Sequence, residues 1–213
     1  MKKVDMIVKA PHFFTMEGEG VGYMTGAAMV VNGGKILGFV GPEEEREYVA
    51  DQVIELSHHA ILPGFIDGHM HTGDAILRGL AQDTNNWMMY GLQPFENAVT
   101  LEDKIAGSRM ALLEAIRNGT TTLGDYWGEM DDVCAFIDKV GARGNKTQRV
   151  RAAKYKVYKP GELYEFDDAM GEESLAETIA LYDKWHNRAG RRIKILFGPQ
   201  GVDFLSIVLL KNT

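Results

Sequence analysis

From residue 60 onward, short apolar runs alternate with stretches of helical periodicity, and this alternation leaves few folds open to the chain. The apolar runs predict strands at Ala60–Asp67, Thr120–Asp125, Arg149–Val157 and Arg192–Phe197. The stretches between them predict helices that begin at Thr100, at Asp131 and near Glu173. Strands separated by helices pair in parallel, so the sequence predicts an α/β fold.

Local signals mark the ends of these helices. Thr100 and Asp103 form the Thr-x-x-Asp pattern of a capping box at the start of the first helix. Gly119 and Gly141 follow the first and second helices, and glycine readily adopts the backbone conformation that ends a helix. The third helix is expected to end near His186.

The part of the chain before residue 59 follows another pattern. Short apolar runs alternate there with glycine, and Asn32-Gly33 is a strong turn signal between Ala28–Val31 and Ile36–Val40. We therefore expect a small β domain of the sandwich type over residues 1–58. The α/β domain would occupy residues 59–213.

Two histidines, His69 and His71, stand one residue apart at the end of an apolar run. In a strand, residues i and i+2 point to the same face, about 6 to 7 Å apart at the backbone. Two imidazoles at that spacing can share one metal ion, although a catalytic site needs at least three protein ligands. The same pattern also arises in half-exposed strands without a metal. Gly68 leaves room for close approach at the carboxyl end, where active sites of parallel α/β folds gather.

Several further segments resemble the amidohydrolase superfamily, in the branch of aminohydrolases and chlorohydrolases. That branch includes triazine hydrolases, guanine and cytosine deaminases, and methylthioadenosine/S-adenosylhomocysteine deaminases. The similar segments follow the family's order, and they are Val30–Gly41, Val53–Leu56, Leu62–His71, Leu77–Leu80, Trp87, Pro94–Glu96, Gly119–Thr122 and Gly198–Gly201.

The resemblance implies a metal-dependent (β/α)8 hydrolase barrel, which needs about 250 residues. The sequence offers about four βα units, so we expect a partial barrel and a chain that is the amino-terminal half of a larger enzyme. The family takes further ligands from later strands, a histidine from the fifth, a histidine from the sixth and an aspartate from the eighth. No position here matches them, and the catalytic acid/base residue is expected in the missing half.

The implied activity is hydrolysis of a non-peptide carbon–nitrogen bond, by deamination or dechlorination of an N-heterocycle with metal-activated water. The expected cofactor is one divalent ion, zinc first, with iron, nickel or manganese as alternatives. Two other interpretations stay open. In the first, the chain acts without catalysis, as a fragment that associates with other chains. In the second, it belongs to a cyclic amidase of the imidazolone or dihydropyrimidine type.

Three residues are candidates for substrate contact. Trp87 is either a wall that stacks on an aromatic substrate or part of a buried helical turn. Glu96 lies where the resembling deaminases carry a substrate-contacting glutamate, but it could equally be a solvated loop charge. Gln200 follows the last predicted strand, where an amide can pair with ring nitrogens, or it is a turn residue between Pro199 and Gly201.

Composition narrows the classes of partner. The net charge is −7 at pH 7 and basic residues do not cluster, which disfavours binding to a nucleic-acid backbone. The single cysteine, Cys134, excludes an internal disulfide framework. Asp5 and Lys9 interrupt the first apolar run, so neither a signal peptide nor a membrane partner is expected. We expect a cytoplasmic protein with a small heterocyclic substrate, which forms a homo-oligomer or associates with a complementing half.

Overall fold

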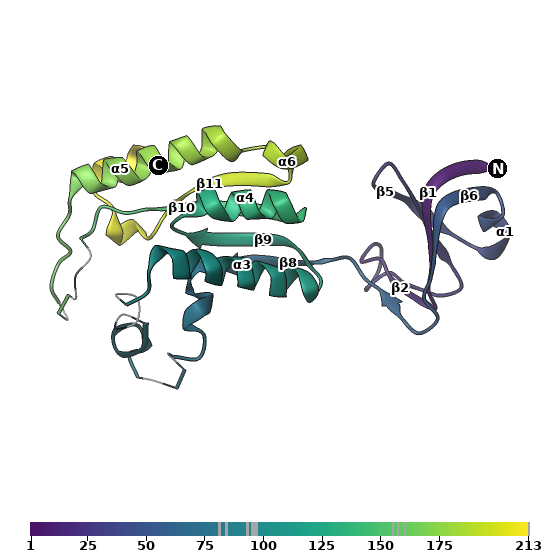
Figure 1. Ribbon diagram of the computed structural model, residues 1–213, viewed down its shortest axis with the longest axis horizontal. Helices are drawn as coiled ribbons and strands as arrows, with labels where there is room; N and C mark the ends of the chain where they lie inside the picture. Colours follow the sequence, from purple (N-terminus) through teal and green to yellow (C-terminus); the bar gives the residue numbers. More distant parts are fainter. Residues whose placement is uncertain are drawn as a thin grey trace. The chain divides into compact units, whose positions relative to one another are not determined.

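The structure is a computed structural model that describes residues 1–80, 82–83, 85–92, 94, 98–154, 156, 158–159 and 161–212. The chain divides into two compact units, Met1–Pro63 and Gly64–Thr213. Figure 1 colours the first unit purple to blue and the second teal to yellow.

The first unit is built on two small sheets. The larger has the strand order β5-β4-β1-β6 and comprises β1 (Lys2–Lys9), β4 (Ala28–Asn32), β5 (Lys35–Val40) and β6 (Tyr48–Glu55). The smaller has the order β3-β2-β7 and comprises β2 (His12–Phe14), β3 (Tyr23–Met24) and β7 (Ala60–Ile61). A short helix, α1 (Pro42–Glu45), precedes β6. The β content matches the expectation for this part of the chain, and its assignment to a sandwich stays a prediction.

The predicted hairpin is present in the larger sheet. Strands β4 and β5 pair antiparallel, with Asn32 opposite Lys35. Gly33 and Gly34 form the turn with φ of 60° and 71°, values that a side chain would disfavour. The sheet buries Val4, Ile7, Ala28, Val30 and Val40 as the core of this unit.

The second unit is a parallel sheet with helices packed on it. The strand order is β11-β10-β9-β8, with β8 (Phe65–Met70), β9 (Thr120–Trp127), β10 (Arg143–Val150) and β11 (Ile193–Pro199) all parallel to their neighbours. The longer helices are α3 (Leu101–Arg117), α4 (Met130–Val140) and α5 (Asp168–Trp185). The shorter ones are η1 (Thr72–Leu77), η2 (Trp87–Leu92), α6 (Arg188–Arg191), η3 (Val202–Phe204) and α7 (Ile207–Asn212).

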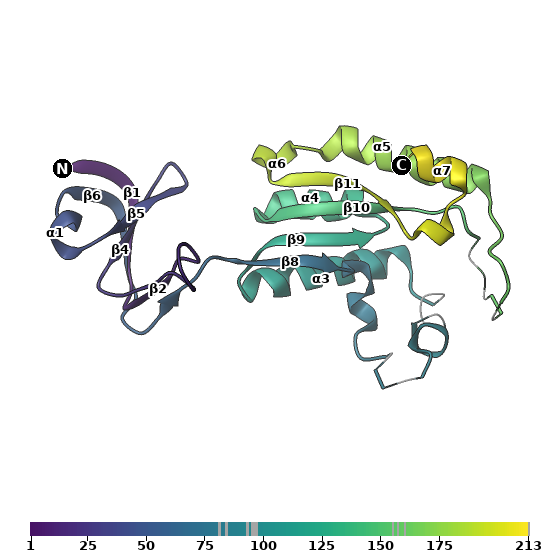
Figure 2. The same cartoon turned by 180° about the vertical axis from the view of Figure 1, so that it is seen from behind.

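The helices cover one face of this sheet. Helices α3 and α4 lie in front of the strands in Figure 1, and the strands lie in front of them in Figure 2. The core between them joins alternate strand residues, such as Leu123 and Ile195, to helix residues such as Leu112 and Ile137. Within the described residues, none of the helices combines the length and apolarity that a membrane crossing requires.

The predicted signals at helix ends are mostly confirmed. Thr100 caps α3, and both hydrogen bonds of the capping box with Asp103 are present. Gly141 ends α4 with a φ of 79°. The start of α5 was predicted too late, because Asp167 caps the helix by accepting a hydrogen bond from the Met170 N–H.

Two strand predictions were wrong. The expected strand Ala60–Asp67 is divided into β7 and β8, since Pro63 between them has no N–H to donate to a ladder. The expected strand Arg149–Val157 starts instead at Arg143 and ends at Val150. Its polar sequence concealed it, because Lys146 is a buried residue of β10 and not a surface residue.

Candidate active site

The two histidines of the predicted metal site lie together at the carboxyl end of β8. His69 belongs to the strand, and His71 directly precedes η1. Their ring centroids are 4.7 Å apart, with the ring planes nearly perpendicular at 83°. Both side chains are exposed. The structure therefore brings together the two residues that the sequence paired by spacing.

The neighbouring strand determines which ring nitrogen of neutral His71 carries the proton. Its Nδ1 lies 2.6 Å from the carbonyl oxygen of Tyr126 in β9. A carbonyl can only accept, so Nδ1–H donates and Nε2 keeps its lone pair in the neutral ring. This is the arrangement that a histidine ligand of a metal ion normally has.

His69 lies where the pairing of β8 with β9 is irregular. The register shifts between Asp67 and Met70. In this stretch the backbone N–H of His69 donates to Asp67 Oδ1 at 3.1 Å. Gly124 permits the irregularity, since a Cβ added there would lie 2.6 Å from the carbonyl oxygen of Gly68.

The donor set fits part of a metal centre. Two imidazoles converge and one is held in the tautomer that leaves a lone pair on Nε2. Among the residues that the structure describes, no group of three or more histidine, cysteine or carboxylate side chains gathers closely enough to hold an ion. The chain thus supplies two donors of a site that needs at least one more.

Behind His71 lies a buried polar cluster that the sequence did not reveal. Asp125 is 1% exposed and accepts hydrogen bonds from the Thr72 N–H at 3.1 Å and the Thr72 hydroxyl at 2.5 Å. Lys146 Nζ lies 3.4 Å from the same carboxylate. Because Asp125 is buried, its carboxylate is not solvated. Lysine is rarely fully buried, so the position of Lys146 could not be predicted from its residue type.

Burial changes the acidity of two groups near this cluster. It lowers the pKa of Lys146 from the ordinary lysine value, while the charge of Asp125 acts in the opposite direction. It raises the pKa of the Cys134 thiol to about 12. Neither group is exposed.

The structure describes two of the three residues that were predicted to contact the substrate. Trp87 lies in the helical turn η2 and its side chain is 51% exposed, and its contact with a substrate stays a prediction. Glu96 lies outside the described residues, and its role stays a prediction. Gln200 follows β11, and its side-chain Oε1 accepts a hydrogen bond from Arg151 Nη1 at 3.0 Å.

Arg151 connects Gln200 to the loop after β10. The guanidinium donates to the carbonyl oxygens of Ala153 at 2.5 Å and Lys154 at 3.2 Å. It also lies 4.5 Å from the ring centroid of Phe204. The orientation of the Gln200 amide is therefore set by an arginine that is 8% exposed.

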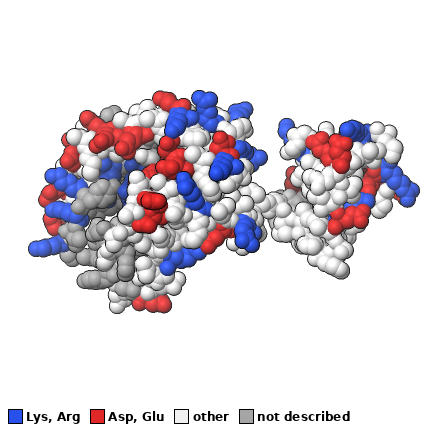
Figure 3. All heavy atoms as spheres, in the orientation of Figure 1, with Lys and Arg blue, Asp and Glu red and all other residues white. Residues whose placement is uncertain are grey.

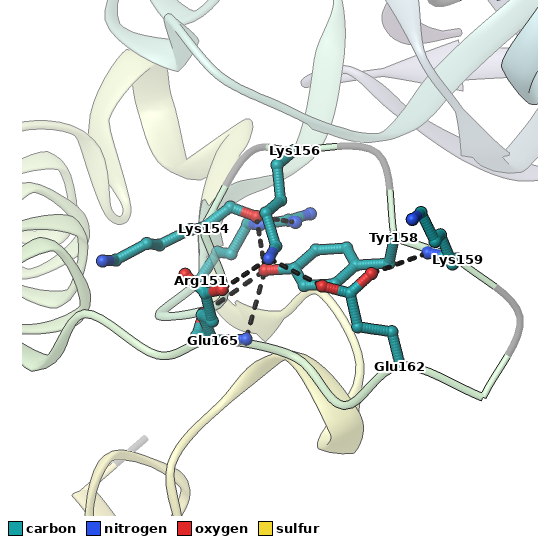
Figure 4. A network of polar contacts seen from close by, with 7 residues as sticks. All are labelled: Arg151, Lys154, Lys156, Tyr158, Lys159, Glu162 and Glu165. Atoms are coloured by element: carbon teal, nitrogen blue, oxygen red, sulfur yellow. Dashed lines mark hydrogen bonds and ion pairs between the residues drawn. The ribbon is translucent and has the colours of Figure 1, made fainter.

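The same loop is closed by a second group of contacts, shown in Figure 4. Lys156 Nζ pairs with Glu162 at 2.8 Å and with Glu165 at 2.5 Å. The Tyr158 hydroxyl donates to the carbonyl oxygen of Lys154 and accepts from the Glu165 N–H. These contacts hold both sides of the loop together at the Lys154 carbonyl, to which Arg151 also donates.

The model of the amidohydrolase family matches residues 60–195, which is more than half of the chain. The chain belongs to the amidohydrolase family. The resemblance inferred from the sequence is thereby confirmed, and the matched region of this amidohydrolase contains His69, His71 and the buried cluster.

Curated relatives of the amidohydrolase are deaminases by name. A 5-methylthioadenosine/S-adenosylhomocysteine deaminase of Thermoanaerobacter pseudethanolicus is 33% identical over 181 residues, which are 84% of this chain and 39% of the relative. A 5'-deoxyadenosine deaminase of Methanococcoides burtonii is 30% identical over 197 residues, 92% of this chain and 42% of the relative. The chain spans about two fifths of the length of these relatives.

Solved structures share the fold of the amidohydrolase. An adenosine deaminase from Xanthomonas campestris with bound zinc has a TM-score of 0.78 at 22% identity, over 93% of this chain and 43% of that one. A guanine deaminase from C. acetobutylicum with bound guanine has a TM-score of 0.77 at 19% identity, over 96% and 48%. The α/β fold is thus of the type that these hydrolases have.

Proposed function

We propose that this chain carries the first part of the metal site of a hydrolytic deaminase that acts on an N-heterocycle of the adenosine type. The observation that carries the proposal is the pair His69 and His71, with the His71 ring held by Tyr126 so that Nε2 can bind a metal. The names of the relatives at 30% identity or more favour deamination over dechlorination. Residues 59–213 would then form the first half of a barrel, and residues 1–58 part of a β-sandwich.

In this proposal the two imidazoles hold one divalent ion, and zinc is the first choice. When bound, such an ion supplies a water molecule of lowered pKa that can attack an electron-poor ring carbon. The Tyr126 carbonyl keeps the proton on His71 Nδ1 and fixes the ring. The residue that moves a proton to the departing amine is not assigned within this chain.

The substrate side of the proposal uses three residues. Trp87 offers an exposed ring for stacking against a planar heterocycle. Gln200 offers an amide whose oxygen already accepts from Arg151. Its amide N–H groups are then oriented as donors toward a ring nitrogen or carbonyl. Glu96 would contact the substrate as a carboxylate.

Metal retention tests the central part of this proposal. Zinc bound per chain is measured for the wild-type protein and for His69→Ala, His71→Ala and His186→Ala. His186 is the matched control. It is the C-cap residue of α5, and its Nδ1 lies 3.2 Å from the backbone nitrogen and carbonyl oxygen of Ile195. We expect the first two variants to lose zinc and the control to keep it. Equal zinc in all four proteins would refute the site.

A second candidate function, association without catalysis, is favoured by the open sheet of the second unit. In the described part of the chain, β8 and β11 are the two edges of this sheet and neither has an outer partner. Unpaired edges favour pairing with another chain, either a second copy or a complementing half. We also propose a cytoplasmic location, which the single buried cysteine supports.

A further inference from the structure

The buried cluster behind His71 contacts the site through two adjacent residues of β9. The Asp125 carboxylate binds Thr72, and the Tyr126 carbonyl binds the ring of His71. Successive residues of a strand point to opposite faces. The Asp125 contact comes from a side chain and the Tyr126 contact from the backbone, so two neighbours in β9 hold the two neighbours His71 and Thr72 after β8.

Backbone pairing between β8 and β9 does not hold His71 and Thr72 in place. The register of β8 on β9 shifts between Asp67 and Met70, and Met70 is the last residue of β8 that is paired. His71 itself lies beyond the strand, with a φ of −128° and a ψ of 84°. The next peptide group is held by the side chain of Asp125, because the Thr72 N–H donates to it at 3.1 Å.

The carboxylate is suited to this task because its charge is compensated inside the protein. A buried carboxylate needs a counter-charge or several donors to remain ionised. Asp125 has both, with two donors from Thr72 and the ammonium of Lys146, whose side chain is fully buried. An ionised acceptor binds its donors more strongly than a neutral one.

We propose that Asp125 is a positioning residue for the metal site, which acts through Thr72 to hold His71 in the orientation that a metal ligand needs, with Lys146 as its buried counter-charge. This inference rests on the proposed function, because it assigns His71 as a ligand. Asp125 itself touches neither metal nor substrate in this proposal.

The test replaces the Thr72 hydroxyl and leaves both charges in place. Thr72→Val removes one donor to Asp125 with almost no change of shape. Thr178→Val is the matched control, since Thr178 is equally buried and its hydroxyl binds the Ser174 carbonyl within α5. Thr72→Ser keeps the hydroxyl and should restore the wild-type behaviour.

Two measurements are made on the whole chain. The first is the imidazole ¹⁵N spectrum without metal, which reports the tautomer of His71 directly. We expect the Nδ1–H form in the wild type, in Thr178→Val and in Thr72→Ser, and a mixture of tautomers in Thr72→Val. The second is titration with zinc alone, in which Thr72→Val should weaken binding by about tenfold, as is typical for loss of a group that orients a ligand.

The results separate this inference from the proposed function. If the wild type binds no zinc but Thr72→Val changes the His71 tautomer, the positioning role stands and the metal site fails. If Thr72→Val matches Thr178→Val in both the spectrum and the zinc affinity, the positioning role is refuted, even if His69 and His71 bind the metal.

Discussion

Gly124 is the residue on which the irregular pairing beside His69 depends. A Cβ added there would lie 2.6 Å from the Gly68 carbonyl oxygen and 3.1 Å from that of Asp67, and backbone atoms cannot move aside easily. We expect Gly124→Ala to lower the free energy of unfolding by about 1 to 3 kcal/mol, the usual cost of overpacking. Gly128→Ala is the control, because a Cβ at Gly128 meets no atom within 4 Å. Urea denaturation measures both, and equal stability of the two variants would contradict this account.

Lys146 should be far more important for stability than a lysine in a surface ion pair. Lys146→Met leaves the Asp125 charge buried without its cation, which is expected to cost about 3 to 5 kcal/mol. Lys184→Met removes the exposed pair of Lys184 with Asp131, which should cost less than about 1 kcal/mol. Unfolding in urea at pH 7 compares the two. Similar losses would mean that Asp125 does not depend on Lys146.

Cys134 should make the protein less stable at alkaline pH. Burial raises the pKa of its thiol to about 12, whereas an unfolded cysteine has a pKa of about 8.5. Between these values the unfolded chain loses the proton and the folded chain keeps it, so stability falls as pH rises. From pH 8 to pH 10 the wild type should lose about 2 kcal/mol more than Cys134→Ala.

This difference is read from urea denaturation at the two pH values. Burial lowers the pKa of Lys146, so this lysine makes stability rise with pH. Because both proteins contain Lys146, its contribution cancels in the difference between them. Parallel pH dependence of the two proteins would show that the Cys134 thiol is not protected from ionisation.

At the residue scale, the sequence could predict what depends on spacing and not what depends on distant contacts. His69 and His71 are two positions apart, a spacing that in a strand puts two side chains on one face, and their rings do lie together at the end of β8. The contacts that fix them join Thr72 to Asp125 and Tyr126 to His71, more than 50 positions along the chain. Only the fold brings these residues together.

At the element scale, helices α3 and α4 were predictable because their ends carry local signals, Thr100 for the first and Gly141 for the second. Strand β10 was not, since Arg143–Val150 has the polar sequence of an exposed loop. Pairing with β9 on one side and β11 on the other makes it a strand. Tertiary context therefore outweighed local preference here.

The loop between β10 and α5 should depend on the shape of the Arg151 side chain. Arg151→Lys keeps the charge but loses the fork that binds the carbonyls of Ala153 and Lys154 and the Gln200 amide. We expect trypsin to cleave after Lys154 roughly tenfold faster, as fits the loss of about 1 to 3 kcal/mol of buried hydrogen bonding. Arg143→Lys, at an exposed position of β10, is the control. Unchanged cleavage in Arg151→Lys would show that the loop is held by the Lys156 pairs instead.

At the scale of the whole molecule, the helices among the described residues of the second unit cover one face of its sheet and leave the other face bare (Figure 2). Ile195 is 2% exposed on the helix side, whereas its neighbour Leu196, on the other face, is 50% exposed. Figure 3 shows the opposite, helix-covered face of this unit, on which acidic and basic side chains are interspersed. The open face instead exposes apolar side chains such as Leu196, so any association through this sheet should be apolar in origin and persist at high salt.

We accordingly expect the purified chain to self-associate as its concentration rises, with little change between low and high salt. Sedimentation velocity measures the mass distribution over a concentration series. Leu196→Thr should shift it toward the monomer, because it removes apolar area from the sheet face. Leu163→Thr is the control, since Leu163 is 87% exposed but lies in the loop after β10. If both variants associate like the wild type, the contact lies elsewhere. A wild type that stays monomeric at every concentration would argue that the open face needs no second chain, and would leave the metal site as the function to pursue.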